Sequence, residues 1–413
     1  MTTVQPKLTF VFIFLLLTIL YYFLRFQWGW DSYIVIMQIG LLGLFSFSGL
    51  LRTILNKSDP IFFHIFVIYS LLLLLPTYFR GEFSGLFYGL KDYVIPATLL
   101  LGFSYFIPKH KIKEVFYYVS IICGIVSIIY FSEFVSKNIL FSGYFSYTDG
   151  IRVLSEATGA DGIAESSFEG GLSSFFRLPG PLSHNNATGL AIAVGALATM
   201  PLLQRKRSII IKAVFAICLI TLLVSGARTA WIAFMLSALF YYREKRTIWI
   251  TFVVVIVFCF WLLVYFLPAF IGTINIETLL NTAFIIFSEF ENFDGGRIYN
   301  LVIGSGYNYP GMKTGYSSNL NPLLNDDLFI IQLATIYGVL PLLMFAYCIF
   351  SMKTIPKVDP DYVYINAANA ILICFAVSAM HTNALIRPQL YPIFFLFIVA
   401  KHLLYKSYKE NKV

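Results

Sequence analysis

Long runs of apolar residues, separated by short polar breaks, follow one another along almost the whole chain of 413 residues. A helix needs about 20 apolar residues to cross the hydrocarbon core of a membrane. Runs of about this length predict twelve membrane helices, over residues 8–24, 33–52, 60–79, 92–107, 114–135, 187–203, 208–224, 228–242, 247–271, 328–351, 361–380 and 388–405. The pattern therefore predicts an all-α integral membrane protein with a single polytopic domain over residues 1–413.

The composition agrees with this pattern, because 59% of the residues are hydrophobic and only 12% are charged. A soluble protein carries about 25% charged residues. The net charge of +8 needs no nucleic-acid partner to explain it, since the basic residues of membrane proteins collect in cytoplasmic loops. The five cysteines all lie inside apolar runs, which predicts buried thiols rather than a disulfide framework or a zinc site.

The polar breaks predict how the chain is oriented in the lipid bilayer. With a cytoplasmic N-terminus, 19 of the 29 basic residues fall in inside segments, mostly very short loops. The positive-inside rule favours this orientation, which also puts the C-terminus in the cytoplasm. Two long polar segments, 137–186 and 272–327, then form large loops on the outer side. Loops of this length are usually functional or disordered, and the aromatic residues of these two favour order.

Arginine is frequent on the predicted outer side of the membrane. Seven of the ten basic residues there are arginines: Arg25, Arg80, Arg152, Arg177, Arg228, Arg297 and Arg387. A guanidinium group binds phosphate bidentately and stays charged when partly buried. These arginines predict an anionic ligand at the outer surface, and a lipid-linked diphosphate fits because its anion lies at headgroup depth. The alternative is that each arginine pairs with one of the acidic residues on the same side.

Three of these arginines have a distinctive local sequence. Arg228 follows Ser225-Gly-Ala and begins a predicted helix, where a charge is expensive unless it is paired or used. Arg177 precedes a Pro-Gly-Pro turn that fixes its backbone. Arg297 follows two glycines, which would let the backbone approach a ligand closely.

Several polar residues on the same side are candidates for accepting a proton. His184 precedes a predicted helix, and histidine suits general-base work. Asp326 and Asp327 precede the 328–351 segment, where they would act either as a base or as helix caps. His381, in the last outer loop with Arg387, is a further candidate.

One further pattern, Asp359-Pro-Asp361, has the spacing of metal-dependent sugar-nucleotide transferases. It lies in a short inside loop, however, and is typical of an N-cap followed by proline at the first helical position. The sequence therefore predicts neither a metal site nor a cofactor.

Four sequence elements together resemble a known family. They are Arg177-Leu-Pro-Gly180 with His184-Asn185-Asn186; Ser225-Gly-Ala-Arg228; Gly296-Arg297 with Gly304-Ser-Gly306; and Asp326-Asp327 with Gly338-Val-Leu-Pro341. In this combination and order the chain resembles the O-antigen polymerase and O-antigen ligase superfamily of bacterial inner-membrane glycosyltransferases. The resemblance covers most of the chain.

The resemblance implies a GT-C-like glycosyltransferase of the bacterial inner membrane that uses neither a metal nor a nucleotide sugar. A glycan on undecaprenyl diphosphate would be transferred to a lipid-linked repeat unit, which builds O-antigen, capsular polysaccharide or exopolysaccharide. Arg228 and Arg297 would hold the diphosphate, and Asp326, Asp327 or His184 would accept the proton. The residues expected to bind substrate are Arg177, Asn185, His381 and Arg387. Whether a polysaccharide chain-length regulator also binds is left open.

Two alternatives accompany this prediction. In ligases of the superfamily the late polar pair is typically His-Asn, so Asp326-Asp327 favours a polymerase over a ligase that transfers glycan to lipid A-core. Twelve helices are also typical of transporters and lipid-linked oligosaccharide flippases. Ion-coupled carriers usually need ionisable groups within the membrane. Here nearly all such groups lie at helix ends, and two long outer loops favour a site at the outer surface.

Overall fold

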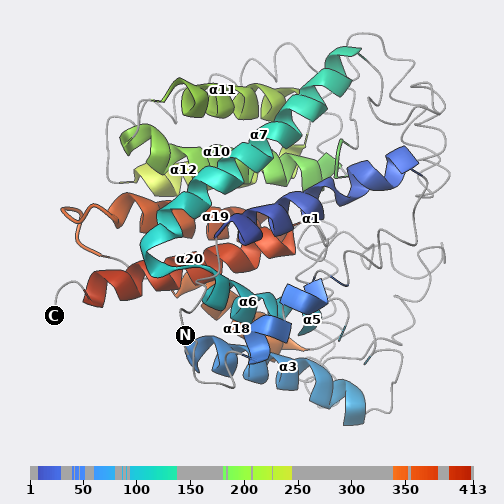
Figure 1. Ribbon diagram of the computed structural model, residues 1–413, viewed down its shortest axis with the longest axis vertical. Coiled ribbons are helices and arrows are strands. Elements are labelled where there is room, and N and C mark those ends of the chain that lie inside the picture. The colour runs from blue at the N-terminus through green and yellow to red at the C-terminus, as the bar shows by residue number, and fades with distance from the viewer. Residues whose placement is uncertain are drawn as a thin grey trace, which may run out of the picture.

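The structure is a computed structural model that describes residues 8–28, 40, 42–45, 47–51, 60–79, 86, 90, 94–136, 180–182, 185–205, 208–225, 227–243, 338–351, 355–379 and 390–410. In this part of the chain the regular elements are helices, and no strand is present. The longer helices are α1 (Leu8–Trp28), α3 (Pro60–Phe79), α6 (Leu99–Phe106), α7 (Ile112–Ser136), α10 (Asn185–Arg205), α11 (Ile209–Val224), α12 (Arg228–Tyr242), α18 (Val339–Phe350), α19 (Tyr362–Ala379) and α20 (Tyr391–Glu410). They form one bundle (Figure 1).

The described helices coincide with predicted apolar runs. Three of them are long and apolar enough to cross a membrane: Lys109–Val135, Asn186–Arg205 and Tyr362–Ala379. The all-helical prediction is therefore confirmed for the described residues, as is the presence of helices suited to a membrane. The predicted helix 247–271, the loop 272–327 and most of the loop 137–186 lie outside these residues. The total of twelve membrane helices stays a prediction.

The predicted run 92–107 contains two labelled helices, α5 (Ile95–Ala97) and α6, on either side of Thr98. Thr98 keeps helical backbone angles, φ −61° and ψ −20°. Its N–H donates to the carbonyl of Val94, and its carbonyl accepts from the N–H of Gly102, both at 3.2 Å. The Thr98 hydroxyl donates a further hydrogen bond to the carbonyl of Ile95. The irregularity is local, and the chain stays helical across Thr98 as predicted.

Helix α10 is the centre of the bundle. It contacts α7, α11, α12 and α19, and 89% of its membrane-crossing window is buried. Small residues allow this close packing, as is usual between membrane helices. A Cβ atom at Gly195 would lie 2.4 Å from the Cβ of Cys123 on α7, and one at Gly189 would lie 2.5 Å from the Cβ of Ala227 before α12. Larger residues at these glycines would push the neighbouring helices away.

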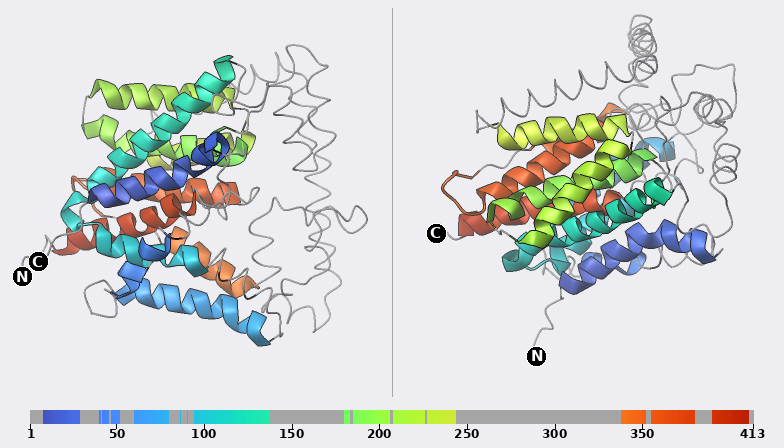
Figure 2. Two further views of the ribbon diagram at one scale, coloured as in Figure 1. Left: turned by 45° about the vertical axis from the view of Figure 1, so that its right-hand side comes forward. Right: turned by 90° about the horizontal axis from the view of Figure 1, so that it is seen from above.

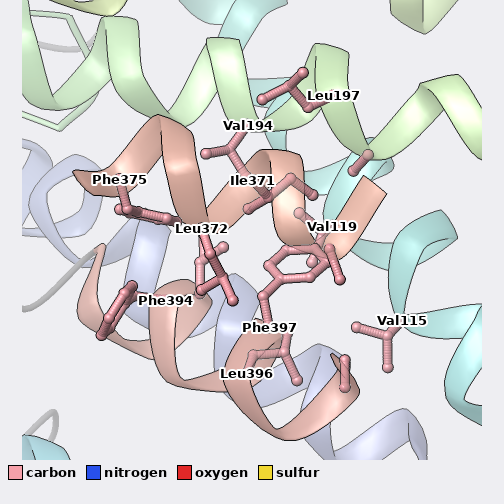
Figure 3. Packing of buried hydrophobic residues seen from close by; sticks show 14 of the residues in the cluster. Val115, Val119, Val194, Leu197, Ile371, Leu372, Phe375, Phe394, Leu396 and Phe397 are labelled. Carbon is pink, nitrogen blue, oxygen red and sulfur yellow. The ribbon is translucent and has the colours of Figure 1, made fainter. Parts of the chain in front are cut away.

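Branched and aromatic side chains fill the space between α10 and the later helices. Figure 3 shows Val194 of α10 above Ile371 of α19, with Phe397 of α20 below them. All three side chains are fully buried. The ring of Phe397 packs edge-on against Phe116 of α7, with ring centroids 5.3 Å apart. This core fixes α7, α10, α19 and α20 relative to one another.

The helices of the bundle run roughly along one direction, so their ends gather at two opposite ends (Figure 2). At one of these, which we call the basic end, lie Lys109, Lys113, Arg205, Arg243, Asp361 and Glu410. Lys109 pairs with Glu410 at 2.6 Å, Lys113 pairs with Asp361, and Arg205 donates a hydrogen bond to the carbonyl of Pro360. The sequence predicts that these segments lie on the same side of the membrane, and in the structure they meet at one end of the bundle. That this end faces the cytoplasm stays a prediction.

Candidate functional site

At the opposite end of the bundle, three stretches that are far apart in the sequence meet. They are the C-terminal part of α7, the turn 180–182 that leads into α10, and the turn between α11 and α12. We call Tyr130, Gly180, Thr188, Ser225 and Ala227, which join these stretches, the motif junction. Two of the four family-like elements, those ending in Asn186 and Arg228, adjoin it directly.

The glycine of the Pro-Gly-Pro turn is fixed by its backbone and by its neighbours. Gly180 has φ +68°, a conformation that L side chains rarely adopt. A Cβ atom there would lie 2.6 Å from the ring of Tyr130 and 2.8 Å from the methyl group of Thr188. The turn is therefore seated directly on α7 and on the first turn of α10.

The turn between α11 and α12 is held by hydrogen bonds to its backbone. The Tyr130 hydroxyl donates to the carbonyl of Ser225 at 3.3 Å. The Ser225 hydroxyl donates to the carbonyl of Leu222 at 2.8 Å and accepts from the N–H of Ala227 at 3.3 Å. The indole N–H of Trp231 on α12 also donates to the Leu222 carbonyl, at 2.7 Å. These bonds fix the position at which α12 begins.

The first turns of α10 and α12 lie against each other. A Cβ atom at Gly189 of α10 would be 2.5 Å from the Cβ of Ala227 and 3.0 Å from that of Ala230. Asn185 begins α10 and Arg228 begins α12, so these two predicted site residues open neighbouring helices at the same end. Their side chains lie outside the described residues. At the level of the backbone, the structure brings two of the predicted elements together.

The position of Arg228 is not explained by the stability of its own helix. It is the first residue of α12, and the first turn of α12 contains no acidic residue. The N-terminus of a helix carries a partial positive charge, so a basic residue there is unfavourable. Ala227 before it provides no side-chain cap either. Helix formation alone therefore does not favour an arginine at this position.

Seven other predicted site residues lie outside the described residues: Arg177, His184, Arg297, Asp326, Asp327, His381 and Arg387. Their roles stay predictions. The family-like elements after residue 290 are likewise outside, apart from Gly338 and the start of α18. Gly338 has φ +88° and precedes α18, which explains glycine at this point of the late element.

A buried carboxylate near the motif junction was missed by the sequence reasoning. Glu133 lies on α7 three residues after Tyr130, and its side chain is only 3% exposed. Among the buried residues of the described helices, Glu133 and Lys401 are the ones with acidic or basic side chains. From the sequence, Glu133 looks like one of many acids at the outer ends of helices. The signal that distinguishes it is its spacing from Tyr130, which puts both on one face of α7.

The pattern Asp359-Pro-Asp361 lies at the basic end, away from the motif junction. The Asp359 carboxylate accepts a hydrogen bond from the N–H of Asp361 at 2.8 Å, and Asp361 pairs with Lys113. Helix α19 begins at Tyr362, so Pro360 lies in the turn before the helix and not at its first position as predicted. The carboxylates thus have structural partners. Within the described residues, no group of three or more His, Cys, Asp or Glu side chains could hold a metal ion.

Comparison with protein-family models, with characterised proteins and with solved structures finds no match to this chain. The functional interpretation is therefore based on the arrangement of the protein's own residues.

Proposed function

We propose that the protein is a membrane glycosyltransferase that polymerises oligosaccharide repeat units carried on undecaprenyl diphosphate. One observation carries the proposal: the elements around Asn185 and Arg228, separate in the sequence, open neighbouring helices at the end of the bundle opposite the basic end. If the basic end faces the cytoplasm, as the positive-inside rule predicts, this meeting point faces the outer surface. A lipid-linked diphosphate presents its charge at that depth.

In the proposed reaction the site has to stabilise the negative charge of the diphosphate as it leaves the donor glycan. Guanidinium groups that are fixed in place before the reaction stabilise developing negative charge far better than mobile ones. The hydrogen bonds around Ser225 and the close packing at Gly189 hold the start of α12, and with it the Cα atom of Arg228. Arg228 and Arg297 would contact the diphosphate, with Arg177, Asn185, His381 and Arg387 around the glycan. Asp326, Asp327 or His184 would take the proton of the acceptor hydroxyl as the glycosidic bond forms.

The test is reconstitution of the purified protein in proteoliposomes with lipid-linked repeat units. The expected product is a ladder of longer glycans on the carrier lipid, formed without a nucleotide sugar. Arg228→Ala should lower the rate about a hundredfold or more, since it removes a group that acts on the developing charge. The matched control is Lys212→Ala, an exposed basic residue on α11, which should leave the rate unchanged. Absence of any longer glycan with the unaltered protein would refute the proposal.

The polar pair Asp326-Asp327, in place of the His-Asn typical of ligases, favours the polymerase over the ligase. The lipid-linked pool of a deletion strain separates the remaining activities. Loss of a polymerase leaves single repeat units attached to the surface, whereas loss of a ligase leaves long chains on the carrier lipid. Loss of a flippase leaves single units facing the cytoplasm. Either of the last two results would replace the polymerase proposal.

A further inference from the structure

Four of the basic residues at the basic end are held in two different ways. Lys109 and Lys113 each pair with a carboxylate, that of Glu410 or Asp361. Arg205 and Arg243 instead donate hydrogen bonds to neutral oxygen atoms, one of a backbone carbonyl and one of a side-chain amide. Among the residues that the structure describes, no carboxylate pairs with either guanidinium group. The two arginines are therefore held in place without being neutralised by a described acid.

Arg243 is oriented by both of the helices beside it. It follows α12 directly, and its Nη1 atom donates to the carbonyl of Phe240 at 3.2 Å and to the side-chain oxygen of Asn366 on α19 at 3.1 Å. The guanidinium carbon lies 3.9 Å from the centre of the Phe240 ring. Asn366 is buried and donates in turn to the carbonyl of Tyr241 at 2.7 Å. A planar guanidinium group that is held through one nitrogen can offer its other N–H groups to a further acceptor.

Arg205 lies at the same end of the bundle. It is the last residue of α10, which runs in the same direction as α12 and contacts both α12 and α19 (Figure 1). Its Nη2 atom donates to the carbonyl of Pro360, in the turn before α19. Both arginines are exposed. The first part of α19 and the turn before it thus orient two exposed guanidinium groups at the basic end.

The surroundings of these arginines have the character of a membrane interface. Tyrosine is enriched where a membrane protein passes from lipid to water, and Tyr242 and Tyr362 lie at the end of α12 and the start of α19. Two apolar residues at the start of α11 are open to the outside, since Ile209 is 77% exposed and Ile210 is 54% exposed. Apolar surface is unfavourable in water and is expected where acyl chains cover the protein. The basic end therefore fits the depth of phospholipid headgroups.

We propose that Arg205 and Arg243 bind the phosphate groups of anionic phospholipids in the leaflet that adjoins the basic end. The fork of N–H groups on a guanidinium matches the oxygen atoms of a phosphate. Basic positions between membrane helices suit such headgroups, and an anionic lipid brings no positive charge of its own to compete for the phosphate. Lys109, which is already paired with Glu410, takes no part. The binding does not depend on the glycosyltransferase activity proposed above.

The test is a lipid titration of the purified, full-length protein in detergent micelles, followed by thermal unfolding. Dioctanoyl phosphatidylglycerol should raise the unfolding midpoint by about 2 °C or more, because it binds the folded protein, whereas dioctanoyl phosphatidylcholine should have little effect. Each arginine should contribute roughly fivefold to the affinity. Arg205→Gln and Arg243→Gln should therefore each raise the half-maximal concentration of phosphatidylglycerol about fivefold. Equal responses of the unaltered protein to the two lipids would overturn the proposal.

The matched control is Lys109→Gln, which removes one positive charge from the same end and should change the half-maximal concentration by no more than about twofold. An effect as large as that of the arginine variants would mean that only the overall charge matters. If Arg205→Gln and Arg243→Gln lower the midpoint equally with and without lipid and leave the half-maximal concentration unchanged, the arginines act only as helix caps. An equal response to glycerol phosphate would mean a site for free anions. Any of these three results would overturn the proposal. Where a glutamine variant does not fold, the lysine variant at the same position should still weaken binding, since an ammonium group lacks the planar fork.

Discussion

The two ends of the bundle are held together by different kinds of interaction. At the basic end, charged pairs connect the start of α7 to the turn before α19, and Lys109, just before α7, to the end of α20; the Lys109–Glu410 pair is almost half exposed to solvent. At the motif junction, hydrogen bonds to backbone groups and contacts between small residues connect α7, α10 and α12. Exposed ion pairs are weak, screened by salt and easily replaced. Close backbone packing tolerates very little change.

This contrast indicates where the chain needs accuracy. Loop ends that only have to stay on one side of a membrane can be held loosely by charge, as the positive-inside rule predicts for the basic end. The site proposed above would have to hold a diphosphate and an acceptor sugar in register, and it needs helices that start at defined positions. The motif junction has this second character. Its residues come from three separate segments, since Tyr130 lies 50 residues before Gly180 and Ser225 lies 37 residues after Thr188. Substitutions at the two ends should therefore differ strongly in effect.

The largest effect on stability is expected at the Pro-Gly-Pro turn. Gly180→Val combines a strained backbone at φ +68° with a Cβ atom 2.6 Å from the Tyr130 ring. Strain of this kind together with overpacking should lower the free energy of unfolding by about 3 kcal/mol or more. Thermal unfolding in detergent measures this. Gly43→Ala, where a Cβ atom would meet nothing within 4 Å, is the control and should be close to neutral. A stable Gly180→Val protein would contradict the rigid seating of this turn.

A smaller effect is expected when the hydrogen bond between α7 and the turn before α12 is removed. Tyr130→Phe keeps the ring that packs on Gly180 but loses the 3.3 Å bond to the Ser225 carbonyl. The loss should cost about 1 kcal/mol of unfolding free energy. If the bond helps to fix Arg228, the lengthening rate should fall further than this small loss of stability explains. Tyr117→Phe, at an exposed position of α7, should change neither quantity.

Much of the scaffold could be predicted from hydrophobic runs, because the length of a membrane helix is set by the bilayer itself. The run 228–242 matches α12 at both ends, and the runs 114–135, 187–203 and 361–380 overlap the three helices suited to crossing a membrane along most of their length. The local irregularity at Thr98 was not predicted, since a hydroxyl that binds its own helix leaves no trace in hydrophobicity. A periodic pattern gives the existence of a helix more readily than its local irregularities.

The candidate site was predicted less completely, for a physical reason. Arg228 and Asn185 were selected by local sequence, and the meeting of α10 and α12 depends on Gly189 fitting against Ala227, a contact between residues 38 positions apart. Glu133 was missed because its importance lies in its burial, which depends on how α7 faces the other helices. Composition shows that a carboxylate is present but cannot show what surrounds it.

The smallest effect is expected at the basic end, where it completes the comparison. Lys109→Ala removes an exposed pair in which the Lys109 Nζ atom lies 2.6 Å from one Glu410 oxygen and 2.7 Å from the other. Such a pair contributes roughly 0.5 kcal/mol, less at high ionic strength. The unfolding midpoint of Lys109→Ala should therefore differ slightly from that of the unaltered protein at low salt and coincide with it at about 1 M salt. The lengthening rate should stay unchanged, because no step of the proposed reaction uses this end. A rate as low as that of Arg228→Ala would mean that the basic end takes part in the reaction. The two ends of the bundle would then not differ in how accurately their residues must be placed.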